Sequence, residues 1–364
     1  MRLLKGLLRI IGIVVIPVAL YLLVWPVPID PVAWDAPDDR GFVEPYAPNE
    51  RLQRAVAIDI GEHEGPEDVA TGPDGQLYST SASGAILRYG TNGAVGVFAD
   101  TGGRPLGIEI DTDGTLVVAN ATLGLQRIGL DGSVENILSA VDGRELVYAD
   151  DLAIATDGTI YFSEASTKYG AEANGGTYPA SLLDINEHGG YGLIIAFDPA
   201  SGKARTIIDG LNFANGVAIS EDQSYLLIAE TGSYRILKHW LSGPDAGQTE
   251  VLTDNLPAYP DNINTGMNGR FWVGLIAPRL AVIDRFSGSP FVRKILQRFP
   301  PQFRPRALPH SQVIAINGDG EVLMNLHDAN ARFPALTGVL ETADTLYLTT
   351  LFGSQLPYIR IADL

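Results

Sequence analysis

The chain has 364 residues, 46 % of them hydrophobic and 19 % charged, which is enough for one large all-β domain or two ordinary domains. Its formal net charge of −18 and the lack of a long basic tract argue against nucleic acid as a partner. The absence of cysteine excludes disulfide frameworks, thiolate zinc sites and cysteine nucleophiles.

The N-terminal segment has the composition of a membrane anchor. Residues 10–27 are almost all apolar, and about 20 apolar residues suffice to cross a bilayer. Charged residues flank this run, basic before it and acidic after it: Arg2, Lys5 and Arg9, then Asp30, Asp35, Asp38 and Asp39. This asymmetry predicts a single-pass protein with a cytoplasmic N-terminus and an extracytoplasmic main domain, periplasmic or luminal. A cleaved signal peptide is the alternative, although no clear A-x-A-like site follows the run.

One pattern then recurs six times along the chain. A tight-turn residue is followed within a few positions by a short β-type run such as QLYST, TIYFSEA or TLYLTT. The turn residues are Asp74, Asp113, Asp157, Asp222, Asn268 and Asp344. Recurrence about every 40–50 residues, with four short strands per unit, is typical of a β-propeller. We therefore predict an all-β, six-bladed β-propeller over residues 51–364, preceded by an anchor at 1–27 and a Pro- and Asp-rich extended linker at 28–50.

Two modules are longer than the others. The gaps after Asp157 and Asn268 indicate insertions at residues 166–190 and 278–309. The second insertion is basic and carries several phenylalanines. It could form a lid over the mouth of the channel, rest on anionic lipid near the anchor, or be a solvated loop.

Equivalent positions in the six modules bring polar residues to one mouth of the channel. Counting back seven residues from each turn reaches Glu67, Leu106, Asp150, Asn215, Asp261 and Thr337. Four of these are oxygen donors that suit Ca²⁺, whereas the lack of cysteine and the scarcity of histidine argue against zinc or copper. A single Asp or Asn before a strand is usually a turn or cap residue. Several carboxylates at one register would repel one another, however, and a bound cation resolves that repulsion.

The next position in each module reads Asp68, Gly107, Asp151, Gly216, Asn262 and Gly338. Asp68 and Asp151 could bind a second, deeper metal, but hydrogen bonds to loop backbone amides are the simpler interpretation. Asn262 could assist at the first metal or donate to an oxyanion.

Several stretches resemble the calcium propellers that include gluconolactonases, paraoxonases and diisopropylfluorophosphatase, and in particular their strictosidine synthase-like branch. These stretches are GPEDVA, GRPLGI, DDLAIATDGTIYFSEAS, FANGVAIS, YPDNI, FWVG and LHDANA, and they span residues 65–351. The resemblance lies in their order and spacing and not in any one motif. An N-terminal membrane anchor also fits that branch.

The resemblance implies a site and an activity. It makes Glu67, Asp150, Asn215 and Asp261 the calcium ligands and Asp261 the candidate nucleophile or general base. The family usually has Asn where this chain has Asp150, and the paraoxonase histidine pair has no counterpart near Leu106. Thr337 stands where true strictosidine synthases carry a catalytic glutamate, so alkaloid synthesis is not expected.

Two functions from different classes follow. The first is calcium-dependent hydrolysis of small esters or lactones, with Asp261 and Asn262 as catalytic residues. The second is a membrane-anchored binding platform with a structural calcium ion, because propellers often serve as rigid scaffolds.

Overall fold

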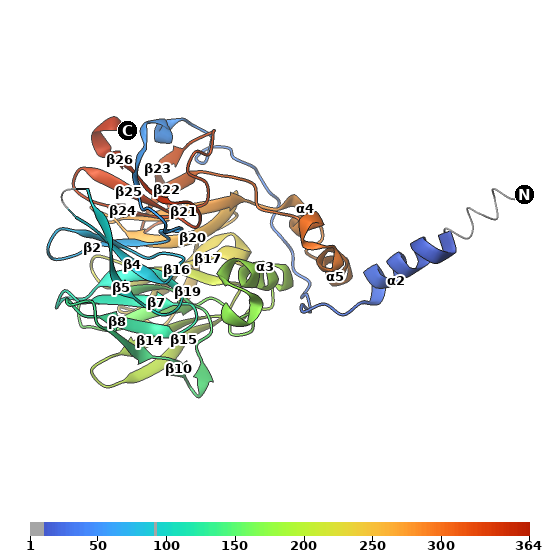
Figure 1. Ribbon diagram of the computed structural model, residues 1–364, viewed down its shortest axis with the longest axis horizontal. Helices are drawn as coiled ribbons and strands as arrows, with labels where there is room; N and C mark the ends of the chain where they lie inside the picture. The colour runs from blue at the N-terminus through green and yellow to red at the C-terminus, as the bar shows by residue number, and fades with distance from the viewer. Residues whose placement is uncertain (1–10, 91–92) are drawn as a thin grey trace, which may run out of the picture.

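The main body of the protein is a ring of six four-stranded antiparallel sheets in the computed structural model, which describes residues 11–90 and 93–364 (Figure 1). The six-bladed propeller predicted from the repeats is therefore confirmed. Each predicted turn residue lies in the hairpin between the first two strands of its blade. In four of these turns the aspartate carboxylate accepts the amide hydrogen two residues further on, as for Asp113 and Thr115 at 2.9 Å.

The strands of each blade run outward from the axis in chain order. Blade 1 comprises β2 (Val69–Thr71), β3 (Leu77–Ser79), β4 (Ala85–Tyr89) and β5 (Val95–Asp100). Blade 2 comprises β6 (Pro105–Ile110), β7 (Leu116–Asn120), β8 (Gly124–Ile128) and β9 (Val134–Leu138). Blade 3 comprises β12 (Ala149–Ile154), β13 (Ile160–Glu164), β14 (Gly192–Asp198) and β15 (Lys203–Leu211). Between blades 2 and 3 lies a small hairpin of β10 (Ala140–Val141) and β11 (Arg144–Glu145).

The last three blades follow the same plan. Blade 4 comprises β16 (Ala214–Ile219), β17 (Tyr225–Glu230), β18 (Arg235–Trp240) and β19 (Thr249–Thr253). Blade 5 comprises β20 (Ala258–Thr265), β21 (Arg270–Pro278), β22 (Gln312–Asn317) and β23 (Val322–His327). Blade 6 comprises β24 (Leu336–Glu341), β25 (Thr345–Thr350), β26 (Gln355–Arg360) and, as its outer strand, β1 (Val56–Asp59).

The ring is closed by strands from the two ends of the propeller sequence. β1 pairs antiparallel with β26, with Val56 opposite Tyr358 and Asp59 opposite Gln355. Apolar side chains between neighbouring blades then form nearly continuous buried layers, of which Ile195, Phe162 and Leu152 are typical members. Closure in this way protects the edges of the ring and ties the start of the domain to its end.

Both predicted insertions leave the same side of the ring and carry helices (Figure 1). The insertion in blade 3 contains a 3-10 turn at Glu172–Asn174 and helix α3 (Thr177–Glu187). The insertion in blade 5 contains α4 (Ala281–Arg285), α5 (Pro290–Arg298) and a 3-10 turn at Pro301–Phe303. The remaining short turns are Arg51–Arg54, Thr231–Ser233 and Ile361–Asp363.

Residues 28–50 lie along this side of the ring as an extended strap, and arginines of the blade 5 insertion hold it there. Arg293 donates to the carbonyl oxygens of Val32 and Ser287, and Arg279 donates to that of Pro37. A proline-rich segment makes few backbone hydrogen bonds of its own, so buried guanidinium groups satisfy its carbonyl groups. Two arginines of the basic insertion therefore make contacts within the protein.

The N-terminal segment is helical where it is described. A π-helical turn (Ile11–Val15) continues into α2 (Ile16–Val24), whose end is fixed by Arg298 of α5, which donates to the carbonyl oxygens of Leu22 and Trp25. Among the residues that the structure describes, no helix is both long and apolar enough to cross a membrane. The start of the predicted anchor, with Arg2, Lys5, Arg9 and Ile10, lies outside the described residues.

Candidate functional site

In blades 2 to 6 the innermost strand is irregular where the predicted site residues lie, and in blade 1 these residues directly precede the strand. The strand register shifts between Ala149 and Leu152, a stretch that holds Asp150 and Asp151. Comparable shifts flank the site positions of blades 2, 4, 5 and 6. A β-bulge breaks the alternation of side chains along a strand, so consecutive residues can both point toward the axis. The bulges therefore explain how one short stretch contributes to two layers of polar side chains.

The upper layer, which consists of the four oxygen donors predicted as metal ligands, faces a cavity of about 920 Å³ at the mouth of the channel. Glu67, Asp150, Asn215 and Asp261 all line it, as does Leu106. The remaining wall comes mainly from α3, from the end of β21 with α4 and α5, and from residues 301–309. The blade 5 insertion thus covers the mouth as a lid, one of the three roles that its composition allowed.

Two of the other positions do not line the cavity. Asn262 lies beside Glu67 and donates from Nδ2 to the Glu67 carbonyl oxygen and to Glu67 Oε1, both at 3.2 Å. Thr337 donates from Oγ1 to the same carbonyl oxygen at 2.6 Å. Both residues are fully buried. In this arrangement Asn262 orients Glu67, and its amide group does not face the space where a substrate oxyanion would lie.

The carboxyl groups of the upper layer are held away from water and close to one another. Burial, reinforced by Asp150 and Asp261, raises the pKa of Glu67 well above its usual value. Burial and Asp261 do the same to the pKa of Asp150. Burial raises the pKa of Asp261 to about 7, although the hydrogen bond from Asn215 Nδ2 to Asp261 Oδ1, at 2.5 Å, opposes that rise. Without a cation the site therefore favours partial protonation.

Arg104 is a further member of this charge cluster that the sequence reasoning missed. Its positive charge lowers the pKa values of Glu67 and Asp150, and burial lowers its own. Its Nη1 atom is buried without a hydrogen-bond partner. When all are ionised, three carboxylates and this guanidinium carry a net charge of −2, which one divalent cation would neutralise. The available signal was a lone arginine in the GRPLGI stretch of a strongly acidic chain.

The donor atoms fit a hard cation. The described residues include no group of three or more His, Cys, Asp or Glu side chains whose positions already suit a metal ion. The upper layer combines carboxylates with a carboxamide, and three of its buried oxygens accept no hydrogen bond: Glu67 Oε2, Asn215 Oδ1 and Asp261 Oδ2. A buried oxygen without a partner costs about 1–3 kcal/mol. Calcium prefers such oxygen donors, so the residues present suit it.

The lower layer, at the next position of each blade, holds neighbouring blades together through Asp68 and Asp151. Asp68 accepts backbone amides from Val69 and Ile108 at 2.9 Å each, and Asp151 accepts those of Leu152 and Val217 at 2.8 Å. In each case one amide comes from the next blade. The alternate blades have glycine at this position, and a Cβ at Gly107 would lie 2.7 Å from Asp151 Oδ1. All four carboxylate oxygens are thus used by backbone amides, which supports the structural interpretation of Asp68 and Asp151.

We expect Asp151→Asn to destabilise the fold without changing calcium stoichiometry. The new NH₂ group must face one of the two backbone amides, which should lower the free energy of unfolding by about 1–3 kcal/mol. Urea denaturation would measure the loss, with Asp157→Asn, an exposed turn residue of the same blade, as the matched control. Loss of one bound calcium ion per chain would instead establish a second metal site.

Comparisons with known proteins agree with this architecture. A family model described as strictosidine synthase matches residues 150–244, and one described as strictosidine synthase-like, N-terminal, matches residues 44–89. The chain is 31 % identical to strictosidine synthase-like protein 6 of Arabidopsis thaliana, covering 85 % of this chain and 82 % of that one. It is 29 % identical to the adipocyte plasma membrane-associated protein of Bos taurus, covering 97 % and 90 %.

Solved structures share the fold at low sequence identity. A gluconolactonase from Xanthomonas campestris superposes with a TM-score of 0.56 at 16 % identity, covering 83 % of this chain and 91 % of that one. Regucalcin from Agrobacterium tumefaciens, described as a calcium-binding protein, gives 0.56 at 11 % identity, covering 84 % and 94 %. At these identities the likeness concerns the propeller fold.

Proposed function

The chain belongs to the strictosidine synthase-like family of propellers, and on that premise we propose that it is a membrane-associated, calcium-dependent hydrolase of esters or lactones. The observation that carries the proposal is the upper layer. Four oxygen-donor side chains from four blades meet in a cavity large enough for a substrate, and three of them have buried oxygens without a hydrogen-bond partner. A purely structural ion would not need to lie at the base of such a cavity.

Asp261 is the proposed general base. It lines the cavity, and its Oδ2 atom accepts no hydrogen bond, so this oxygen is placed to accept a proton. The carboxylate removes a proton from the water that attacks the substrate carbonyl carbon, and it returns that proton to the departing oxygen as the ester bond breaks. A bound Ca²⁺, held by Glu67, Asp150, Asn215 and Asp261, would stabilise the negative charge that develops on the carbonyl oxygen.

The surrounding residues hold this arrangement in place. Asn262 and Thr337 fix Glu67 through the hydrogen bonds described above, so both are positioning residues. Thr337 is buried and absent from the cavity wall, and its hydroxyl group cannot act as the base that alkaloid condensation needs. Hydrolysis is therefore better supported than strictosidine synthesis.

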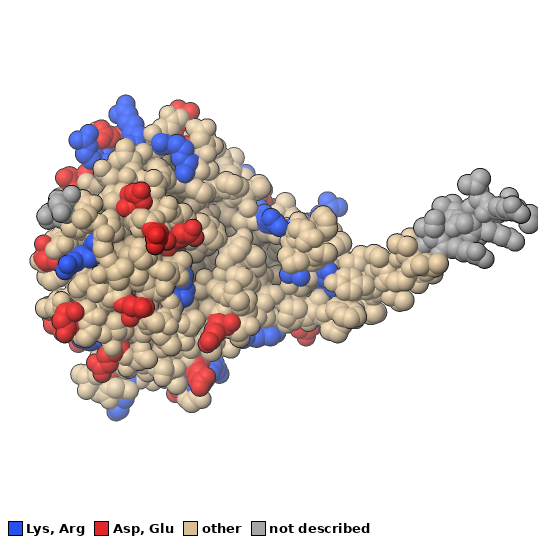
Figure 2. All heavy atoms as spheres, in the orientation of Figure 1, with Lys and Arg blue, Asp and Glu red and all other residues tan. Residues whose placement is uncertain are grey.

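Membrane association through the N-terminal segment is the second part of the proposal. The residues of α2 are apolar and all except Leu22 are exposed, with Val24 69 % exposed, and Figure 2 shows no charged side chain on the face of this helix in view. Related chains carry the name adipocyte plasma membrane-associated protein. We propose that residues 1–27 anchor the protein in a membrane, with the N-terminus on the cytoplasmic side.

The proposal is tested on the full chain in lipid nanodiscs. We expect hydrolysis of at least one member of a panel of aryl esters and lactones, lost on chelation with EGTA and restored by calcium. The metal content of the protein would be measured in parallel. Stoichiometric calcium with no turnover on any substrate would favour the binding-platform alternative, and a chain that binds no calcium would refute the assignment of the site.

A further inference from the structure

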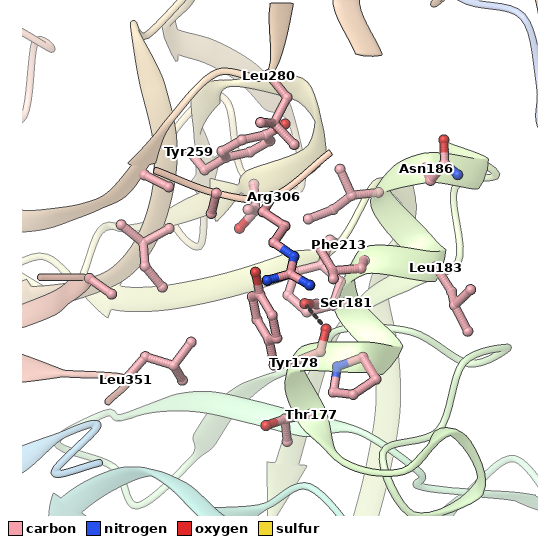
Figure 3. A pocket seen from close by; sticks show the side chains of 18 of the residues that line it. Thr177, Tyr178, Ser181, Leu183, Asn186, Phe213, Tyr259, Leu280, Arg306 and Leu351 are labelled. Carbon is pink, nitrogen blue, oxygen red and sulfur yellow. Dashed lines mark hydrogen bonds between the residues drawn. The ribbon is translucent and has the colours of Figure 1, made fainter. Parts of the chain in front are cut away.

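The cavity has two chemically different ends. Its floor holds the polar side chains of the upper layer, whereas its walls are largely aliphatic and aromatic. Figure 3 shows Tyr178, Phe213, Tyr259, Leu280 and Leu351 around the enclosed space. These side chains come from α3, from three different blades and from the lid, so the apolar lining is assembled by the whole mouth and is not one local patch.

The volume of the cavity exceeds what a small ester requires. At about 920 Å³ it lies near the upper end of the range for drug-sized ligands, roughly 300–1,000 Å³. The apolar surface also continues outward, because Leu182, Leu308 and Phe352 line the cavity and are exposed. Arg304 and Arg306 are the cationic side chains in the described wall, and Figure 3 shows Arg306 directed inward beside Tyr178. Most of the wall therefore offers apolar contact alone.

From this polarity we infer that the substrate is an ester or lactone with a medium or long acyl chain, whose carbonyl group reaches the floor while its chain lies beneath α3 and the lid. The inference rests on the proposed hydrolase function and deepens it. Water in an apolar cavity of this size is readily displaced by a hydrocarbon chain, and each buried methylene group favours binding. A short ester would leave most of the wall in contact with water.

The first test is a chain-length series on the full chain in nanodiscs of zwitterionic lipid. We expect kcat/KM for p-nitrophenyl esters to rise by about fourfold per added methylene over the first members from the acetate upward. Leu280→Gln places a polar group in the wall and should lower the ratio of dodecanoate to acetate activity by roughly fivefold to tenfold. The matched control is Leu323→Gln, an exposed leucine on β23 that does not line the cavity, and it should leave the ratio unchanged.

The second test does not depend on turnover or on calcium. A photoactivatable dodecanol, which has no ester to hydrolyse, should label residues 177–187 or 276–309 with EGTA present. An absence of ester turnover would count against the proposed hydrolase, whereas labelling would still support the acyl-chain cavity. A flat chain-length series, or labelling confined to α2, would overturn the inference about the substrate even if short esters are hydrolysed.

Discussion

Asp261→Asn should lower kcat for any ester substrate by about 10²–10⁴-fold while the protein stays folded. The replacement keeps an oxygen that can accept the hydrogen bond from Asn215 Nδ2, which now reaches Asp261 Oδ1 at 2.5 Å. It removes a carboxylate that lines the cavity and has a buried oxygen without a hydrogen-bond partner. Steady-state kinetics with saturating calcium would measure the loss.

The control for this variant is Asp222→Asn, which makes the same chemical change at an exposed turn of blade 4. Its activity should match that of the unmodified protein. Calcium binding by the Asp261→Asn variant, followed by calorimetry, separates a missing base from a missing ligand. Turnover that persists within a few-fold would show that another group activates the water, and the assignment of Asp261 would then fail.

Calcium should stabilise the protein much more at pH 8 than at pH 5. In the metal-free protein the buried carboxyl groups have pKa values above those of the unfolded chain, and that of Asp261 is about 7. The folded state therefore holds protons that the unfolded state has released, so stability falls as the pH rises through this window. Calcium binds the ionised carboxylates, so proton release accompanies binding and its affinity increases over the same range.

The expected size of this effect follows from mass action. Free calcium about 100-fold above its dissociation constant adds roughly 2.7 kcal/mol to the free energy of unfolding. Thermal melts at pH 5 and pH 8, each with EGTA and with calcium, would measure it. Glu109, which is not one of the proposed ligands and whose pKa burial raises to about 8, contributes to the melts both with and without calcium. An equal calcium effect at both pH values would contradict a site built from these carboxylates.

Much of the fold could be predicted because propeller blades are local structures. Each hairpin is encoded by a short stretch, such as the turn at Asp157 and the β run that follows it, so the number of blades could be counted along the chain. The register of the site was predictable for the same reason. A constant distance from the turn places Glu67, Asp150, Asn215 and Asp261 at equivalent points of their blades, and the closed ring brings them to one mouth.

The roles within the site depended on contacts between distant segments. Asn262 and Asp151 carry similar polar groups at the same register, yet one orients Glu67 and the other joins blades 3 and 4. The difference lies in the partner that each side chain meets, which is Glu67 of blade 1 for Asn262 and the Val217 amide of blade 4 for Asp151. No pattern in the sequence indicates that these two residues have different roles.

The sequence by itself therefore determined the repeat, the six blades, the two insertions and the ring of oxygen donors, because turn chemistry and strand periodicity act over a few residues. Only the tertiary structure showed that Arg104 belongs to the charge cluster, that Arg293 fastens the strap, and that the blade 5 insertion closes an apolar cavity. Those features join residues that lie far apart in the chain, and burial gives an isolated arginine or leucine its role only once the ring has closed.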